Sequence, residues 1–136
     1  MAANNPGGAM AAEIDAEVEV FKEIQGQLQS VRTDLQTVLG QMTENEMVQK
    51  ELELVDSSAS VYKMVGPVLI KNSLEDARDT VSKRLEFITA ERDRLEAKTK
   101  ELETRGAAIA TKVQQMQATL QQATVAAVNE VAKQAA

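Results

Sequence analysis

The sequence contains neither cysteine nor histidine. Without cysteine there is no disulfide framework and no thiolate metal site. Without histidine the chain lacks the commonest general base and the commonest metal ligand. We therefore expect no catalytic site, no metal site and no cofactor.

Aromatic residues are also scarce, since they make up 2% of the 136 residues and tryptophan is absent. A compact globular core normally uses more large aromatic side chains than this. Ala, Glu, Lys, Leu, Gln and Arg dominate instead, a composition typical of long helices that bury a narrow seam. The length suits a single domain, which we place at residues 13–136.

The chain also lacks the features of a nucleic-acid or membrane protein. Its formal charge of −6 argues against nucleic-acid binding, which needs a clustered Lys/Arg surface. No apolar run approaches the ~18 residues that cross a bilayer. Residues 1–8 have neither the basic nor the apolar region of a signal peptide. We expect a cytoplasmic protein with no nucleic-acid or membrane partner.

Two segments have the heptad spacing of coiled-coil helices. Residues 13–56 contain no proline, and from Phe21 their apolar residues recur in alternating steps of three and four. Residues 73–128 repeat the pattern and begin at Ser73, a suitable helix cap. Residues 1–12 are rich in small and turn-forming residues and predict a disordered leader, while the C-terminal end predicts a frayed tail.

The two heptad segments fit each other antiparallel in one register. Seam residues whose numbers sum to 130 place an a position opposite a d position. These pairs are Phe21 with Ile109, Leu28 with Leu102, Leu35 with Leu95, and Met42 with Ile88. The weaker positions coincide too, since Ile24 falls opposite Gly106. One register that serves both segments predicts a mainly α fold, a long antiparallel two-helix coiled coil.

Residues 60–71, between the helices, predict a β-hairpin. β-Branched residues flank Gly66-Pro67, where glycine can adopt a positive φ and proline stays out of the ladder. Both strands are almost continuously apolar, so both faces need cover, yet an isolated two-stranded hairpin is marginal in water. The hairpin therefore predicts obligate assembly with other chains. The expected assembly residues are Val61, Tyr62, Met64, Val65, Val68, Leu69 and Ile70.

Two long coiled-coil helices joined through one hairpin resemble a β-class prefoldin subunit. The resemblance extends from Glu13 to Ala123 and is most specific in its central blocks, because a Gly-Pro hairpin at this point between two heptad runs is uncommon. The blocks that carry it are Thr43-Glu44-Asn45, Lys50-Glu51-Leu52, the hairpin from Val61 to Lys71, and Lys83-Arg84-Leu85-Glu86-Phe87-Ile88-Thr89-Ala90-Glu91.

The resemblance implies a hairpin that contributes to an intersubunit β-barrel. It implies a hetero-hexamer of two α-class and four β-class subunits, whose arms grip non-native chains without ATP. It also implies that unfolded or nascent polypeptides, such as actin and tubulin, are passed to the cytosolic group II chaperonin. The implied partners are the sibling subunits, the unfolded clients and the chaperonin.

The charge pattern favours a client-binding site at the free end of the helices. After Gly106 the only charged residues are Lys112, Glu130 and Lys133, against seventeen in the preceding 32 residues. An apolar, weakly charged end is unusual for a solvated surface, although a frayed tail without a role is the simpler alternative. The expected client-binding residues are Ile14, Val18, Leu120, Val125 and Val128.

Other functions compete with this interpretation. A static coiled-coil scaffold or tether would use the heptads, but it has no need for ten apolar-rich strand residues at its midpoint. A phosphate loop before Lys71 is disfavoured, because no second glycine precedes the lysine and Pro67 removes a backbone donor. The mixed charges of residues 74–105 favour a solvated helix face over a catalytic pair of carboxylates.

Overall fold

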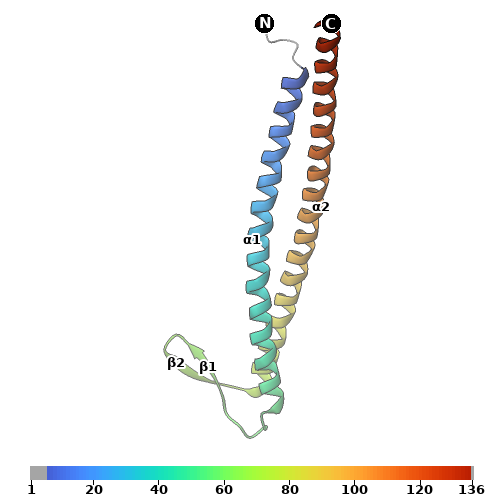
Figure 1. Cartoon of the computed structure of the whole chain (residues 1–136). Helices are drawn as coiled ribbons and strands as arrows, with labels where there is room; N and C mark the ends of the chain where they lie inside the picture. Colours follow the sequence, from blue (N-terminus) through green and yellow to red (C-terminus); the bar gives the residue numbers. More distant parts are fainter. Residues whose placement is uncertain (1–5, 136) are drawn as a thin grey trace. The chain divides into compact units, whose positions relative to one another are not determined.

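The computed structural model of the chain describes residues 6–135. The elements are α1 (Pro6–Leu54), β1 (Val61–Val65), β2 (Val68–Asn72) and α2 (Leu74–Ala135), in that order (Figure 1). This is the predicted fold class, mainly helical with one hairpin between two long helices. The residues divide into two compact units. The terminal unit joins the residues up to Ser30 to those from Thr99 onward, and the hairpin unit is Val31–Lys98.

In the terminal unit, α1 and α2 pack through aliphatic side chains. Ile14, Ile24, Leu28 and Leu102 are all buried, and Leu102 has no exposed surface. Gly106 is buried as well, and a Cβ at its position would lie 3.5 Å from Cγ2 of Ile24. This approach confirms the predicted pairing of Ile24 with Gly106.

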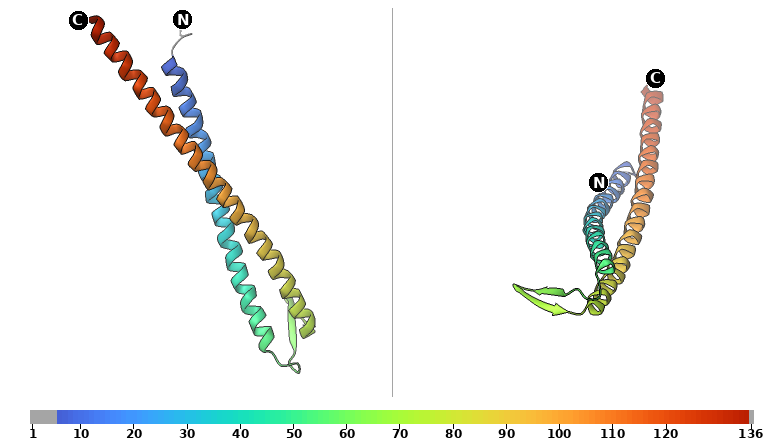
Figure 2. Two further views of the ribbon diagram at one scale, coloured as in Figure 1. Left: turned by 90° about the vertical axis from the view of Figure 1, so that its right-hand side faces the viewer. Right: turned by 90° about the horizontal axis from the view of Figure 1, so that it is seen from below.

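In the hairpin unit, a buried cluster joins the end of α1 to the start of α2. It consists of Leu52, Ala77 and Val81, with Val61, Leu74 and Leu85 packed against it. Because Val61 is the first residue of β1, the cluster anchors the hairpin to the helices. Figure 1 and the right-hand view of Figure 2 show the hairpin projecting sideways from these helix ends.

The start of α1 differs from the predicted one. The helix begins at Pro6, so residues 6–12 of the predicted disordered leader are helical, and residues 1–5 lie outside the described residues. Pro6 stands at the first position of this helix. Proline is in fact well suited to the first turn of a helix, because its missing N–H has no intrahelical partner there and its fixed φ is helical.

The other helix boundaries also differ in part. α1 ends at Leu54 rather than at residue 56, and α2 continues to Ala135 rather than to residue 128. The predicted frayed tail is therefore helical as far as residue 135, consistent with the high helix propensity of its many alanines. The start of α2 is as predicted, since Ser73 Oγ accepts a hydrogen bond from the Asp76 N–H at 3.0 Å.

Candidate functional sites in the hairpin and at the end of α2

The hairpin is a two-residue turn between two antiparallel strands. Val65 pairs with Val68, and Val61 pairs with Asn72. Gly66 has a φ of +58°, a backbone conformation that other residues rarely adopt. Glycine at the first turn position and proline at the second are suited to the twist of the strands. The predicted hairpin is confirmed, with strand residues 61–72 rather than 60–71.

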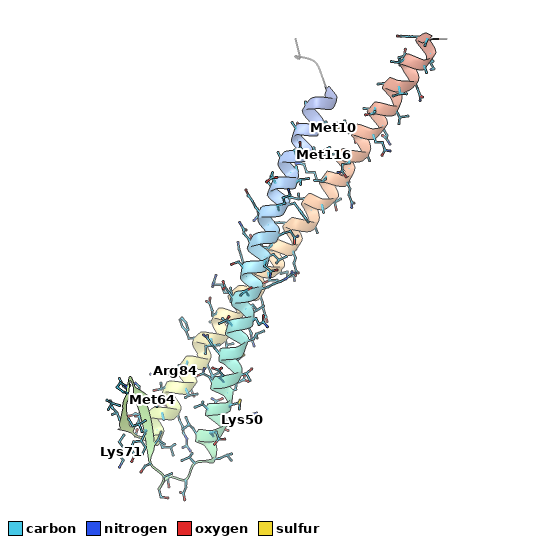
Figure 3. The ribbon with its side chains drawn as sticks, turned by 60° about the vertical axis from the view of Figure 1, so that its left-hand side comes forward. Met10, Lys50, Met64, Lys71, Arg84 and Met116 are labelled. Carbon is cyan, nitrogen blue, oxygen red and sulfur yellow. The ribbon has the colours of Figure 1, made fainter. Side chains whose placement is uncertain are left out.

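The hairpin exposes apolar side chains on both of its faces. Six of the seven expected assembly residues are exposed, from 49% of the side chain at Val65 to 73% at Met64. The six are Tyr62, Met64, Val65, Val68, Leu69 and Ile70. Figure 3 shows Met64 and Lys71 on this hairpin. A contiguous apolar surface of this kind is typical of a protein–protein interface.

Val61 differs from the other six. Its side chain is only partly exposed and packs against the cluster of Leu52, Ala77 and Val81. Alternation along β1 turns Val61 toward the helices while its neighbour Tyr62 lies on the opposite face. The structure therefore gives Val61 an anchoring contact within the chain.

The end of α2 is the second exposed apolar region. Every side chain from 121 to 135 is exposed, including Val125, Val128 and Val131 at 53–65%. An open hollow of about 560 Å³ lies along this end of the terminal unit. Its lining is almost wholly apolar and consists of Gly7, Leu120, Ala123, Thr124, Ala127, Val128 and Val131.

The structure does not bring all the expected client-binding residues onto one surface. Leu120 and Val128 line the hollow, whereas Val125 lies at a separate shallow depression with amide side chains, among them Gln121 and Asn129. Ile14 is only 7% exposed, because it belongs to the seam that packs α1 against α2. Val18, also on α1, is partly buried.

One ion pair links the two helices of the terminal unit. Lys112 Nζ donates a hydrogen bond to Glu17 Oε1 at 2.5 Å. This bond and the attraction of the carboxylate raise the pKa of Lys112 above its usual value, against a smaller opposing effect of burial. One of the few charges after Gly106 is thus paired with a carboxylate of α1. Figure 3 labels Met10 on α1 and Met116 on α2 in the same unit.

Sequence reasoning missed the exposure of Phe87. This side chain is 77% exposed and borders an open hollow of about 370 Å³ with Thr80, Lys83, Arg84 and Ile88. The signal was present, since Phe87 directly precedes the seam position Ile88 and therefore lies off the buried stripe.

Within residues 6–135 there is no group of three or more acidic, histidine or cysteine side chains that could hold a metal ion. In the same part of the chain, neither helix has an apolar stretch of the kind that crosses a membrane.

Comparison with known proteins identifies the family. Residues 15–124 match the family model for prefoldin subunits. The chain is 43% identical to prefoldin subunit 6 of Mus musculus over 91 residues, which cover 67% of this chain and 72% of the mouse protein. It is 36% identical to the probable prefoldin subunit 6 of Caenorhabditis elegans over 110 residues, covering 81% and 87% of the two chains.

A solved structure from the same family has a similar fold. The crystal structure of the prefoldin beta subunit from Thermococcus strain KS-1 superposes with a TM-score of 0.73 at 25% identity, covering 76% of this chain and 90% of the archaeal one. The resemblance to a β-class prefoldin subunit is therefore confirmed in sequence and in fold, and the sequence relatives are subunits of type 6. The chain belongs to the prefoldin subunit family.

Proposed function

We propose that this chain, as a subunit of the prefoldin co-chaperone, binds unfolded or nascent polypeptides without ATP and passes them to the cytosolic group II chaperonin. In this proposal it acts in the cytoplasm within a hexamer of two α-class and four β-class subunits, with actin and tubulin among its clients. The hairpin is the assembly surface and the free end of α2 is the client-binding surface.

One observation carries the proposal: α2 ends in an exposed helix with an apolar surface and few charges. Val125, Val128 and Val131 are each more than half exposed, and only Glu130 and Lys133 carry charge in this segment. Water-exposed valines on successive turns are what a surface for apolar client segments requires. Each contact is shallow, but several such ends on one assembly would raise the effective concentration of sites and so strengthen reversible binding.

Ile14 has a different part in this proposal from the one expected from the sequence. Because it is buried between α1 and α2, it supports the position of α2 rather than touching a client in this arrangement. We retain Leu120, Val125 and Val128 as client contacts, with Val131 added and Val18 at the margin of the surface.

The test replaces the apolar side chains and keeps the helix. The variant Val125→Gln, Val128→Gln, Val131→Gln is co-expressed with the sibling subunits, and suppression of aggregation of a denatured protein is followed by light scattering without ATP. A truncation after Ala118 is the stronger form of the same change. We expect both complexes to assemble at full stoichiometry and to suppress aggregation several-fold less well than the unaltered complex.

The matched control substitutes polar residues of α2 that precede this segment. Gln114→Ser, Gln115→Ser and Gln117→Ser alter three exposed positions that line neither hollow, so holding should be unchanged. Full holding by the truncated complex would move the client surface elsewhere. A fully assembled, unaltered complex that never suppresses aggregation would favour the static tether.

A further inference from the structure

The hairpin is positively charged in an acidic chain. Residues 57–74 contain Lys63 and Lys71 and no acidic residue, although the chain as a whole has a formal charge of −6. Both lysines are exposed. Among the described residues neither lysine has an ion-pair partner. The assembly surface therefore carries two cations that form no ion pair with any described residue.

The strand register places one lysine on each face of the hairpin. Lys63 pairs with Ile70 across the strands, and Lys71 pairs with Tyr62. Cross-strand partners share a face and successive residues alternate, so Lys63 lies on the face of Val61 and Lys71 on the opposite face. Whichever face a neighbouring hairpin covers, it meets a lysine among apolar side chains.

Covering an unpaired ammonium group is strongly unfavourable unless a carboxylate accompanies it. A second copy of this chain has no acidic residue in the hairpin to offer. If the β1 edge of one copy joined the β2 edge of a second copy, equivalent strands would lie two strand spacings apart, about 10 Å. That separation is no more than the screening length in ordinary salt, about 10 Å, so the like charges would repel.

We propose that Lys63 and Lys71 determine which partner hairpins are accepted: they favour partners that place carboxylates beside them, and their charge disfavours a second copy of this chain. The inference rests on the proposed role of the hairpin in assembly and names the chemistry of the partner. Apolar side chains drive the association and the two lysines discriminate between partners, because like charges brought together at an interface cost free energy and so disfavour the wrong partner.

The test uses charge variants of this chain as their own partners. The probe is the full chain with Lys63→Glu and Lys71→Glu, mixed with the unaltered chain at equal concentration and studied by sedimentation equilibrium at low and high salt. We expect the mixture to associate at least about tenfold more tightly than either chain alone at low salt, and the difference to shrink as salt is raised. The neutral variant Lys63→Gln, Lys71→Gln should self-associate more than the unaltered chain.

A control of equal net charge separates hairpin effects from general repulsion. Lys100→Glu and Lys133→Glu change two exposed lysines outside the hairpin, and this variant should gain nothing on mixing with the unaltered chain. If the Lys63/Lys71 mixture associates no better than the unaltered chain alone, or if salt makes no difference, the proposal is overturned. Client holding by the assembled complex does not depend on that result. The failure of one proposal is therefore distinguishable from the failure of the other.

Discussion

Arg78 on α2 donates two hydrogen bonds to the main-chain carbonyl of Leu52 on α1, from Nε at 3.0 Å and from Nη2 at 2.8 Å. Leu52 lies in the last turn of α1, where carbonyl groups have no intrahelical partner. A cation at a helix C-terminus also interacts favourably with the helix dipole. Arg78 thus ties the end of one helix to the beginning of the other, directly beside the cluster that anchors the hairpin.

Replacing Arg78 by alanine should lower the free energy of unfolding by about 1–2 kcal/mol, because the Leu52 carbonyl loses two donors and a charge-assisted bond is worth more than a neutral one. Lysine at this position should recover only part of the loss, since it is a single-point donor without the planar fork of arginine. Urea unfolding of the chain, followed by circular dichroism, measures both. Equal stability of the alanine variant and the unaltered chain would show that water replaces Arg78 without cost.

Within the hairpin, different residues should determine the stability of the chain and its assembly with other subunits. Met64 and Leu69 are paired across the strands and are 73% and 61% exposed, so changing both to glutamine should leave the unfolding of the isolated chain unchanged while reducing incorporation into the hetero-oligomer. Val61→Ala should instead destabilise the isolated chain by about 1 kcal/mol, because it removes apolar surface packed on the anchoring cluster. Native mass spectrometry of co-expressed complexes and chemical unfolding of the chain provide the two measurements.

The reverse pattern would contradict this division. If Val61→Ala left the chain fully stable but abolished assembly, Val61 would belong to the intersubunit contact. If the Met64/Leu69 variant still assembled fully, the subunit contacts would lie on the other face of the hairpin.

Gly106 offers a test of helix packing in the terminal unit. A Cβ at Gly106 would lie 3.5 Å from Ile24 Cγ2, an ordinary contact distance, so alanine fits. Gly106→Ala should therefore stabilise the chain by about 0.5–1 kcal/mol through helix propensity. Gly106→Leu should destabilise it by about 1–3 kcal/mol, because the longer side chain is forced against Ile24.

Gly26 is the matched control for this pair, because a Cβ there meets nothing within 4 Å. Both alanine and leucine at Gly26 should stabilise the helix, and thermal unfolding by circular dichroism compares the four variants. A stable Gly106→Leu protein would mean that α1 and α2 move apart at this layer without cost.

The sequence predicted the fold well because two independent patterns agreed. The heptads of both helices admitted one register, and the structure confirms its pairing of Ile24 with Gly106. Gly66-Pro67 specified the turn, and Gly66 has the positive φ that makes glycine necessary there. Ser73 was recognisable as a cap because a serine hydroxyl before an acidic first turn is a strong local signal.

The errors arose where local sequence is ambiguous. A proline such as Pro6 can mark either the end of one helix or the first turn of the next. Only the residues that follow it decide which of the two applies. Ile14 was expected to bind clients at the free end of the helices, but α2 extends past it and its side chain is buried. The contact of Arg78 with Leu52 joins residues far apart in sequence through a main-chain acceptor, so no side-chain pattern reports it.

The two phenylalanines should respond very differently to truncation, although their residue type is the same. Phe21 is partly buried on α1 and approaches Gly106, with Cε2 3.9 Å from the position of a Cβ there. Phe21→Ala should cost about 2 kcal/mol, less than a fully buried phenylalanine, because part of the ring already faces water. Phe87→Ala should change the unfolding free energy of the isolated chain by less than about 0.5 kcal/mol, since Phe87 is 77% exposed.

Urea unfolding of the isolated chain, monitored by circular dichroism, ranks the two variants, and the same measurement on the assembled complex adds a second comparison. An exposed aromatic ring contributes to stability only when a partner covers it. If assembly buries Phe87, Phe87→Ala should therefore lower the stability of the complex more than that of the isolated chain. A large loss in the isolated chain would instead mean that Phe87 packs within its own unit in solution. The difference between the two losses therefore reports whether the Phe87 surface lies inside or outside the intersubunit contact.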